Sequence, residues 1–477
     1  MPAVFRHSVR GIGVPVCYVF TREKRIQSEW WYAVSRIRRK EGPHLLYPKT
    51  SADVREIILE ARRNGRGLVP VSSGPPHFHG ASENPAAETV SFARMDRIVA
   101  IDRRSRYVRV EPGVTLGTLI PAAAEQGLRL NIPFLPRPSK SAAASALERE
   151  AVLIPKYQYD YPDPLLTVET VFGTGDIFRT GSAAGPGSYE ENKADKVIPW
   201  GPGPFDYYRF LSAAQGTMGF VTWATLKAEV LPRASRLFFI EAASPAPLIT
   251  LAERLLLDRV PDECVLLNRT AFAEAFADAG REDALAAGIG PWVMLCRVCG
   301  FDRYPDERVD IYSGYVAAAC EKLGLTALDR LPVPMEPEQI EAMLTDCDRR
   351  DTYWKLKRGA TRELLMVTPP SRAAAVTAKA AEALPEAGII VSPQVQGRAF
   401  RIECGLYLEK DPGQTEKAEA SLFSLAGDLL PLGAYYDRPY GRLPELLARD
   451  PAASRAAEKL RSIFDPDGIL NPGKLNF

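Results

Sequence analysis

Residues 47–231 alternate short strand patterns with helix patterns, and frequent turns separate them. The stretch SADVREIILEARRNG has apolar residues at helical spacing, with Ser51 as the N-cap and Gly65 as the stop. GLVPVSSG predicts one buried strand, and TVSFARMDRIVAIDRRSRYVRVEPGV predicts three more. LTVETVFGTGDIFRTG predicts a hairpin whose turn holds Gly173, Thr174, Gly175 and Asp176. This region is therefore expected to be α+β and dense in turns.

A second region, about 233–430, repeats a coarse strand, helix, strand rhythm. Its predicted helices are PLITLAERLLL, VAAACEKLGL and SRAAAVTAKAAEALPEAG, and its predicted strands are WVMLCRVCGF, GIIVSPQVQG and FRIECGLYLEK. The chain closes with the helix pattern AASRAAEKLRSIF and the tail DPDGILNPGKLNF. At about 150 residues per domain, a length of 477 residues suggests two large domains or three smaller ones.

Charge and cysteine content restrict the partners and the compartment. The 60 Lys and Arg residues against 59 Asp and Glu leave a formal net charge of +1, which favours neither nucleic acid nor an anionic membrane surface. No stretch of about 18 apolar residues occurs, so we expect no membrane span. Seven cysteines spread over a long chain are typical of a reducing compartment, and we expect a cytoplasmic protein.

Histidine is scarce, and its placement excludes several classes of site. The only histidines are His7, His44, His77 and His79, all in the first 80 residues. A metal centre built from histidines of distant segments is therefore nearly excluded. Cys296 and Cys299 lie in a predicted strand, where residues three apart face opposite sides of the sheet. We expect no metal site, and the absence of a Gly-x-Ser-x-Gly elbow argues against a serine hydrolase.

Five segments, taken in order, carry a resemblance to a known family. They are VPVSSGPPHFHGAS, VEPGVTLGTL, ETVFGTGDIFRTG, WGPGPFDYYRFLSAAQGTMGFVT and FDPDGILNPGK. Because these segments occur together in this order and at this spacing, the sequence resembles the vanillyl-alcohol oxidase superfamily of FAD-dependent oxidoreductases. The resemblance covers most of residues 47–231 and 390–477. The resemblance implies an α+β, two-domain FAD-binding fold with an antiparallel-sheet cap domain. It implies an FAD-binding domain over 1–232, a cap domain over 233–430, and a C-terminal segment, 431–477, that returns to the FAD and the active site.

The resemblance also implies where FAD binds. A strand end followed by a tight turn points backbone N–H groups at a diphosphate, and glycines allow close approach. Of the family's usual glycines in this loop only Gly74 and Gly80 remain, and Pro75 and Pro76 each remove a donor. The expected FAD-binding residues are Val71, Ser72, Ser73, Gly74, Pro75, Pro76, His77, Gly80, Pro112, Gly113, Gly216, Gly219, Val221 and Lys474.

Within the superfamily, the sequence is most similar to the branch that oxidises para-substituted phenols. In that branch an arginine and two tyrosines hold the substrate phenolate, and an acidic residue lies near the flavin. Here Arg438 corresponds to the arginine, and His79 stands at the first tyrosine. Asp437 stands at the second tyrosine, with Tyr436 and Tyr440 close by. The acidic residue corresponds to Glu150 or, if the alignment is shifted by two, to Glu148. The cap's flavin-bonding position falls near Phe400 and Arg401, so we expect non-covalent FAD, with His77 or His79 as the alternative link.

The resemblance implies transfer of a hydride from an aromatic substrate, a para-substituted phenol or aryl alcohol, to the flavin. Arg438 and His79 would absorb the charge left on the substrate, and Tyr157, Tyr159 and Tyr161 either line the pocket or form a half-buried strand. Two alternatives stay open: a 2-hydroxy acid dehydrogenase, and an inactive flavin-binding or electron-transfer subunit. Oxygen, a quinone or a cytochrome would accept the electrons, and we expect a homodimer.

Overall fold

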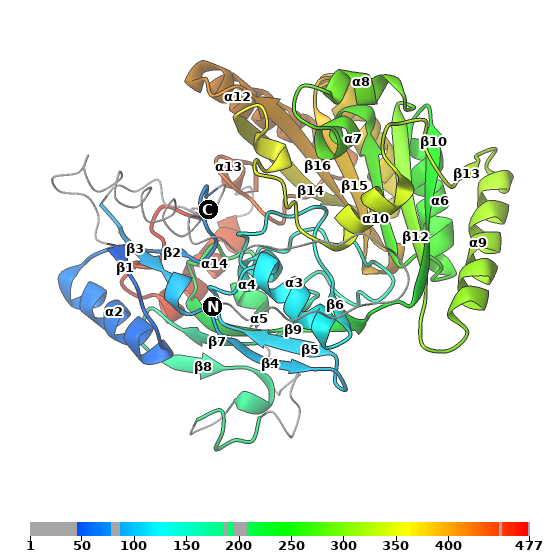
Figure 1. Ribbon diagram of the computed structural model, residues 1–477. Helices are drawn as coiled ribbons and strands as arrows, with labels where there is room; N and C mark the ends of the chain where they lie inside the picture. The colour runs from blue at the N-terminus through cyan, green and yellow to red at the C-terminus, as the bar shows by residue number, and fades with distance from the viewer. Residues whose placement is uncertain (1–44, 78–85, 185–187, 195–207, 448–450, 476–477) are drawn as a thin grey trace, which may run out of the picture. The chain divides into compact units, whose positions relative to one another are not determined.

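A computed structural model describes residues 45–77, 86–184, 188–194, 208–447 and 451–475, in which helices and strands are mixed (Figure 1). A small parallel sheet begins this part of the chain, with its strands in the order β1 (Leu45–Leu46), β3 (Glu88–Ser91) and β2 (Leu68–Val71). Helix α2 (Ser51–Asn64) precedes β2. Thr50 rather than Ser51 is its N-cap, because Thr50 and Asp53 form a reciprocal capping box. Gly65 ends the helix in the left-handed conformation, as predicted.

A second sheet has six strands. Five of them lie in the order β4 (Ile98–Asp102), β5 (Tyr107–Val110), β9 (Phe220–Val230), β7 (Leu165–Val171) and β8 (Ile177–Arg179), and β6 (Leu128–Leu130) also pairs with β9. Its pairings are antiparallel, and the predicted 165–179 hairpin is confirmed. Residues of α3 (Leu116–Glu125) and α4 (Ala142–Leu147) pack against apolar residues of this sheet in one core. A short helix, α5 (Tyr208–Leu211), precedes β9.

The cap domain is built on a seven-stranded antiparallel sheet. Its strands lie in the order β13 (Ala327–Leu328), β10 (Ala234–Ala242), β12 (Trp292–Gly300), β11 (Glu263–Asn268), β15 (Gly388–Gln394), β16 (Ala399–Leu408) and β14 (Ala360–Thr368). One face packs on α6 (Pro245–Leu257), α9 (Pro305–Lys322), α11 (Pro370–Ala383) and α12 (Pro412–Leu429) (Figure 1). The other face packs, over part of its area, on α7 (Arg269–Phe276), α8 (Glu282–Ala287) and α10 (Pro337–Thr345).

Alternation along β16 explains how this sheet can carry both a core and a polar wall. Phe400, Ile402 and Cys404 are buried in the core with the four helices. Successive side chains of a strand point to opposite faces, so Arg401 and Glu403 project from the other face. Both of these side chains line a cavity. The sheet therefore presents charged side chains to a cavity that the end of β2 also lines.

After α13 (Pro444–Leu447) and α14 (Pro451–Phe464), the last described residues return to β2. The backbone N–H of Leu68 in β2 donates to the carbonyl of Ile469 at 2.8 Å, and that of Asn471 donates to Leu68 at 2.7 Å. Earlier, Tyr435 pairs with Val367 of β14. The C-terminal segment thus contacts both β2 and β14, and the division of the chain at residues 232 and 430 stays a proposal.

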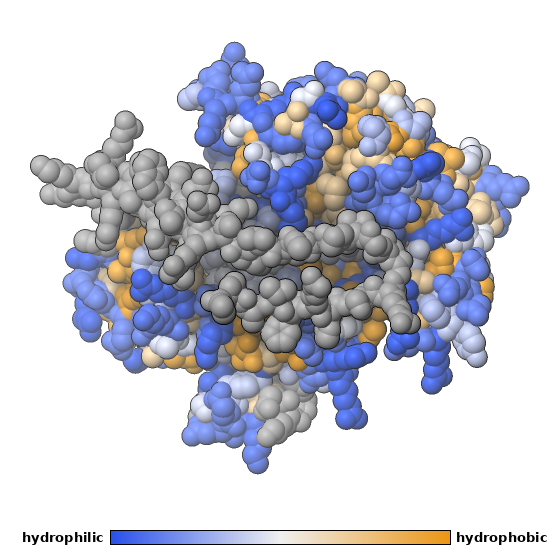
Figure 2. All heavy atoms as spheres, in the orientation of Figure 1, coloured by the Kyte–Doolittle hydropathy of each residue, from blue (hydrophilic) through white to orange (hydrophobic). Residues whose placement is uncertain are grey.

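The surface is mixed, with hydrophilic side chains on the outer end of α12 (Figure 2). Among the described residues, no helix combines the length and the apolar character needed to cross a bilayer.

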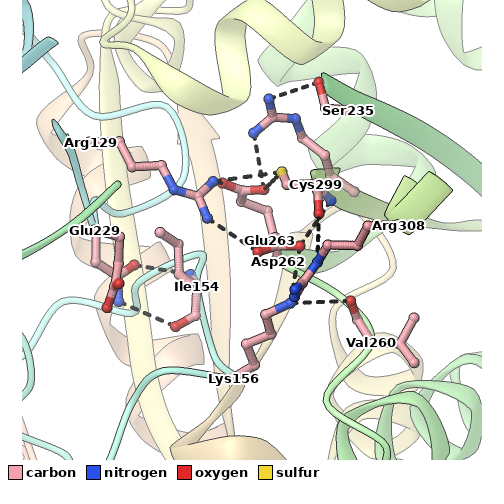
Figure 3. Close-up of polar contacts among 12 residues, drawn as sticks. Arg129, Ile154, Lys156, Glu229, Ser235, Val260, Asp262, Glu263, Cys299 and Arg308 are labelled. Atoms are coloured by element: carbon pink, nitrogen blue, oxygen red, sulfur yellow. Dashed lines mark hydrogen bonds and ion pairs between the residues drawn. The ribbon is translucent and has the colours of Figure 1, made fainter. Parts of the chain in front are cut away.

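A buried charge network joins the two domains (Figure 3). Lys156 Nζ lies 3.1 Å from Asp262 Oδ2, and Arg129 Nη2 lies 3.3 Å from Asp262 Oδ1. Arg129 also pairs with Glu263, which Arg297 contacts at 3.1 Å. Arg129 belongs to β6 and Lys156 to the loop after α4, whereas their partners belong to the cap. The side chain of Asp262 is fully buried, so water cannot replace its contact with Lys156 unless the two domains separate there.

We expect Asp262→Asn to lower the free energy of unfolding by about 3 kcal/mol, because it leaves Lys156 and Arg129 buried with one fewer counter-charge. Chemical denaturation followed by circular dichroism measures the change. Asp329→Asn is the control, since Asp329 pairs with Arg236 at 3.0 Å on the surface and should change stability by no more than about 0.5 kcal/mol. Equal losses of stability from the two substitutions would contradict a stabilising role of the buried Asp262 contacts.

Candidate active site

Two adjoining cavities lie in the described part of the chain. The larger has a volume of about 1270 Å³ and the smaller about 800 Å³, both including space open to solvent. Pro70, Ser72, Ala144 and Glu148 line both, so the two cavities adjoin at these residues. The larger cavity is bounded by the cap sheet as well as by the first domain. The smaller one is lined by the first domain and Tyr440.

Residues expected to bind FAD line the smaller cavity. Pro112, Gly216, Gly219 and Val221 are among them. Gly216 has a φ of 74°, and a Cβ there would lie 2.5 Å from Pro70 Cγ, so only glycine fits. Gly113 is not part of the lining; a Cβ there would lie 2.4 Å from the carbonyl oxygen of Phe92. Its lack of a side chain therefore serves backbone packing.

The end of β2 and the loop after it border the larger cavity through Val71, Ser72, Ser73 and His77. Residues 137–141 brace it: Ser73 Oγ accepts from the Ser141 N–H at 2.9 Å, the Gly74 N–H donates to the Ser139 carbonyl at 2.8 Å, and Arg137 donates to the Pro76 carbonyl. Pro75 and Pro76 themselves are outside the lining.

Burial, and then the nearby Arg137 charge, lowers the pKa of His77 below its usual value, which favours a neutral imidazole. His79 and Gly80, also expected in this loop, lie outside the described residues. Lys474 lines neither cavity; its carbonyl accepts from Arg461 Nη1 at 3.5 Å.

Both candidate acids reach the larger cavity, and both pair with one lysine. Lys140 Nζ lies 2.7 Å from Glu148 Oε2 and 3.3 Å from Glu150 Oε1. Ser145 Oγ donates to Glu150 Oε2 at 2.6 Å. Burial raises the pKa of Glu150, but Lys140 and Arg438 lower it more, so its pKa lies below the usual range. Of the two, only Glu148 also lines the smaller cavity.

This environment predicts how stability depends on pH. Because the folded pKa of Glu150 is depressed, its ionised form stabilises the fold above its ordinary pKa of about 4.3 and loses that contribution as pH falls through the lower folded pKa. Glu150→Gln should therefore lower the melting temperature at pH 7 and differ little from wild type in strong acid. Thermal unfolding at a series of pH values measures this difference. A difference in melting temperature between the two proteins that stays constant into strong acid would contradict a depressed pKa of Glu150.

Arg438 is a buried cation that borders the larger cavity. Its side chain is 6% exposed, and Nη2 lies 3.7 Å from Glu148 Oε2. Burial opposes its charge, but Tyr440, Glu150 and Glu148 raise its pKa further, so it stays charged. Within the described residues, its Nε has no hydrogen-bond partner. A buried donor without a partner is costly, which makes Nε a candidate ligand contact.

The structure corrects two of the three expectations about the tyrosine and aspartate positions. Tyr436 is fully buried in the cap core, where its hydroxyl donates to the Ala426 carbonyl at 2.6 Å, so it is not a site residue. Asp437 lines neither cavity but binds Arg401 at 2.6 Å. Tyr440 does border the smaller cavity, with its ring centroid 5.5 Å from Arg438 Cζ.

The tyrosines at 157, 159 and 161 neither form a strand nor line the two cavities. Tyr159 is 78% exposed. They lie in a loop of turns that leads to β7.

The sequence interpretation missed the cap wall of the larger cavity. Lys355 Nζ lies 2.6 Å from Glu363 Oε1 and 2.5 Å from Glu403 Oε1, and all three residues line the cavity. Alternation in FRIECGLYL could have identified Glu403 as facing away from the core. The strand that carries Glu363, residues 360–368, had not been predicted.

The two adjoining cavities together suit an extended dinucleotide. The smaller cavity offers a glycine-lined channel for its phosphates and nucleoside, and the larger offers room for a ring system beside Arg438. Among the described residues, no group of three or more His, Cys, Asp or Glu is arranged to hold a metal ion. The residues present therefore fit FAD.

Comparison with known proteins agrees with this geometry. The family described as FAD binding domain matches residues 43–181. The chain is 22% identical over 426 residues to the 4-cresol dehydrogenase (hydroxylating) flavoprotein subunit of Pseudomonas putida, covering 81% of this chain and 78% of that protein. It is 27% identical over 203 residues to 1'-carboxy-chondrochloren decarboxylase of Chondromyces crocatus, a match that spans 41% of this chain and only 35% of that protein.

Solved structures share the fold. p-Cresol methylhydroxylase with substrate bound has a TM-score of 0.76 at 18% identity, covering 91% of this chain and 88% of that one. The 4-ethylphenol oxidase of Gulosibacter chungangensis, in complex with isoeugenol, has a TM-score of 0.75 at 19% identity, covering 90% and 88%. The expected α+β, two-domain FAD-binding fold is thus confirmed. The chain is an FAD-dependent oxidoreductase with the fold of p-cresol methylhydroxylase and 4-ethylphenol oxidase.

Proposed function

We propose that this protein oxidises a para-substituted phenol or aryl alcohol in the larger cavity. The observation that carries the proposal is Arg438: a buried, charged guanidinium with an unused donor, next to the carboxylates Glu148 and Glu150. A fixed cation can stabilise an oxyanion on the substrate, and a carboxylate can take its proton. The names of the similar proteins, which include a 4-cresol dehydrogenase and a 4-ethylphenol oxidase, support an aromatic substrate.

The walls of the larger cavity suit an aromatic ring. Phe134 and Pro133 contribute from the first domain, and Leu365 and Ile390 contribute from the cap sheet. Apolar walls with a few convergent polar groups are typical of small-molecule sites. The ring would bury its faces against these side chains while its polar substituents meet the charged residues.

FAD, when bound, supplies the acceptor for a hydride from the carbon that is oxidised. We assign the proton to Glu148, because both oxygens of Glu150 contact Ser145 or Lys140, whereas the described contacts of Glu148 fall on Oε2. Arg438 would stabilise the oxyanion that deprotonation leaves on the substrate, until loss of the hydride neutralises it. His79 stays a predicted second partner for that charge.

Anaerobic reduction of the FAD-loaded protein tests this proposal. We expect 4-hydroxybenzyl alcohol or a 4-alkylphenol to bleach the flavin absorbance, and D-lactate to leave it unchanged. Acid precipitation should release the colour into the supernatant, because we propose that FAD is bound without a covalent link. Bleaching by D-lactate alone would select a 2-hydroxy acid dehydrogenase, and a protein that takes up no FAD would indicate an inactive subunit.

A further inference from the structure

The first-domain wall of the larger cavity contains a residue whose backbone conformation is unusual for its type. Leu135 has a φ of 42°, in the left-handed region that leucine rarely adopts, and the proline that follows it restricts its conformation further. Its side chain is fully buried, and its chain neighbours Phe134 and Pro136 both line the cavity. Strained residues persist only where their surroundings hold them, and they cluster at functional sites. The contacts that hold Leu135 therefore bear on the function of this wall.

Those contacts come from a cap segment between α10 and β14, residues 346–359. Nε1 of Trp354 donates to the Leu135 carbonyl at 3.0 Å, and the backbone N–H of Asp348 donates to the Pro136 carbonyl at 2.8 Å. Trp354 itself is fully buried. Loss of its indole N–H would therefore remove a bond that opposes relaxation of Leu135 toward an ordinary conformation.

Asp348 also fixes the turn that presents Trp354. Its side chain is 1% exposed. Oδ2 accepts from the backbone N–H of Trp354 at 2.7 Å, and Oδ1 accepts from Nε of Arg350 at 2.7 Å. Hydrogen bonds to a carboxylate are charge-assisted and stronger than those between neutral groups. The indole is therefore held in place by its own segment as well as by its bond to Leu135.

Phe134 is the side chain that this arrangement places at the cavity. Its ring lies edge-on to the rings of Trp354 and Phe276, with centroids 6.0 and 5.8 Å apart. Trp354 thus holds Phe134 in two ways, through the contact between the rings and through the hydrogen bond to the carbonyl of the next residue. A shift of the Leu135 backbone would move Phe134 with it.

We infer that Trp354 is a positioning residue that fixes Phe134 as the surface on which the ring of the aromatic substrate packs, an inference that rests on the proposed function. Two aromatic rings attract each other only in certain relative orientations, so a ring surface contributes to binding when its position is fixed. The arrangement favours aromatic over aliphatic alcohols, because an aliphatic chain gains nothing from the orientation of the ring.

Trp354→Phe tests the inference, because it keeps an aromatic ring and removes the N–H donor. The probe is 4-cyanophenol, a phenol without an oxidisable para carbon, whose binding to the FAD-loaded protein is measured by isothermal titration calorimetry. We expect the variant to bind it about fivefold more weakly than wild type and to keep its full FAD content. A wild-type protein that does not bind 4-cyanophenol would overturn the inference at this step.

A double variant distinguishes positioning from a general loosening of the protein. Phe134→Leu removes the ring surface itself and should weaken 4-cyanophenol by about tenfold. If Trp354 acts through Phe134, the variant with both substitutions should also bind about tenfold more weakly than wild type, and not about fiftyfold. Fully additive losses would contradict the inference.

Tyr436→Phe is the matched control. Like Trp354→Phe, it removes one buried donor to a backbone carbonyl, since the Tyr436 hydroxyl donates to the Ala426 carbonyl at 2.6 Å, but Tyr436 lines neither cavity. The two variants should lose similar amounts of melting temperature, and only Trp354→Phe should bind 4-cyanophenol more weakly. Equal weakening in both, or wild-type affinity in folded Trp354→Phe, would overturn the inference.

Asp348→Asn provides the same test if Trp354→Phe does not fold. The amide keeps the size of the side chain but cannot accept with both of its terminal atoms, so the turn that presents Trp354 should loosen. We expect weaker binding of 4-cyanophenol with FAD retained. Wild-type affinity in the folded Asp348→Asn variant would contradict the inference.

The two proposals can fail separately. Weaker binding of 4-cyanophenol by Trp354→Phe, without flavin bleaching of the wild type by any aromatic alcohol, would refute the proposed reaction and keep the positioning role. Bleaching by aromatic alcohols, with no effect of Trp354→Phe on binding, would do the reverse. A loss of FAD affinity with unchanged affinity for 4-cyanophenol would also overturn the inference, because the wall would then serve the cofactor.

Discussion

Replacing Arg438 by methionine should slow anaerobic flavin reduction by an aryl alcohol by about 100-fold to 1000-fold, while FAD stays bound. A fixed donor at a developing oxyanion is typically worth that much in rate. Arg438 is buried at the cavity edge with Nε unpartnered, whereas Glu148 keeps its contact with Lys140 when the guanidinium is removed. The fold should therefore survive the change, and the loss should fall on the chemical step rather than on cofactor binding.

Stopped-flow reduction at saturating substrate measures this effect, with flavin content recorded beside it. Arg442→Met is the control, because Arg442 lies on the surface and pairs with Glu445 at 3.1 Å. Arg438→Lys should restore part of the rate, since a lysine keeps the charge but not the planar fork. A normal rate in the folded Arg438→Met variant would remove Arg438 from the mechanism.

Replacing Ala144 by phenylalanine should weaken FAD binding by about 100-fold. Ala144 lies on α4 and lines both cavities, so a phenyl ring there would fill the space where they adjoin. Overpacking of this kind costs about 3 kcal/mol, and each 1.4 kcal/mol is about a factor of ten in affinity. The purified variant should be pale, and titration with FAD followed by absorbance measures the loss.

Ala124→Phe is the matched control for that substitution. Ala124 is an exposed residue of α3, so a phenyl ring there projects into solvent and should leave FAD binding unchanged. Full FAD content in a folded Ala144→Phe variant would show that the cofactor does not pass through the adjoining cavities.

Local patterns in the sequence predicted much of the secondary structure. The 165–179 hairpin and the stop at Gly65 follow from turn chemistry that a few neighbouring residues determine. The N-cap was misplaced by one residue because Thr50 and Ser51 are both good caps, and only the reciprocal bond with Asp53 decides between them. Strand 360–368 was missed altogether, although it pairs along its whole length with β16.

The site itself was less predictable, because long-range contacts decide it. Tyr436 and Tyr440 are only four residues apart, yet the first packs in the cap core and the second reaches the smaller cavity. Glu403 meets Lys355 across 48 positions of sequence. Arg438 and the two acids of LERE were proposed from the family resemblance, and the structure brings them together around one cavity. No local pattern contains these pairings.

A crystal structure of the protein with FAD and an aryl alcohol or its aldehyde product would test the central claim most directly. We expect the diphosphate along Gly216 and Gly219, and the ligand in the larger cavity with an oxygen within hydrogen-bond distance of Arg438. FAD outside the adjoining cavities, or a ligand oxygen far from that guanidinium, would contradict the account.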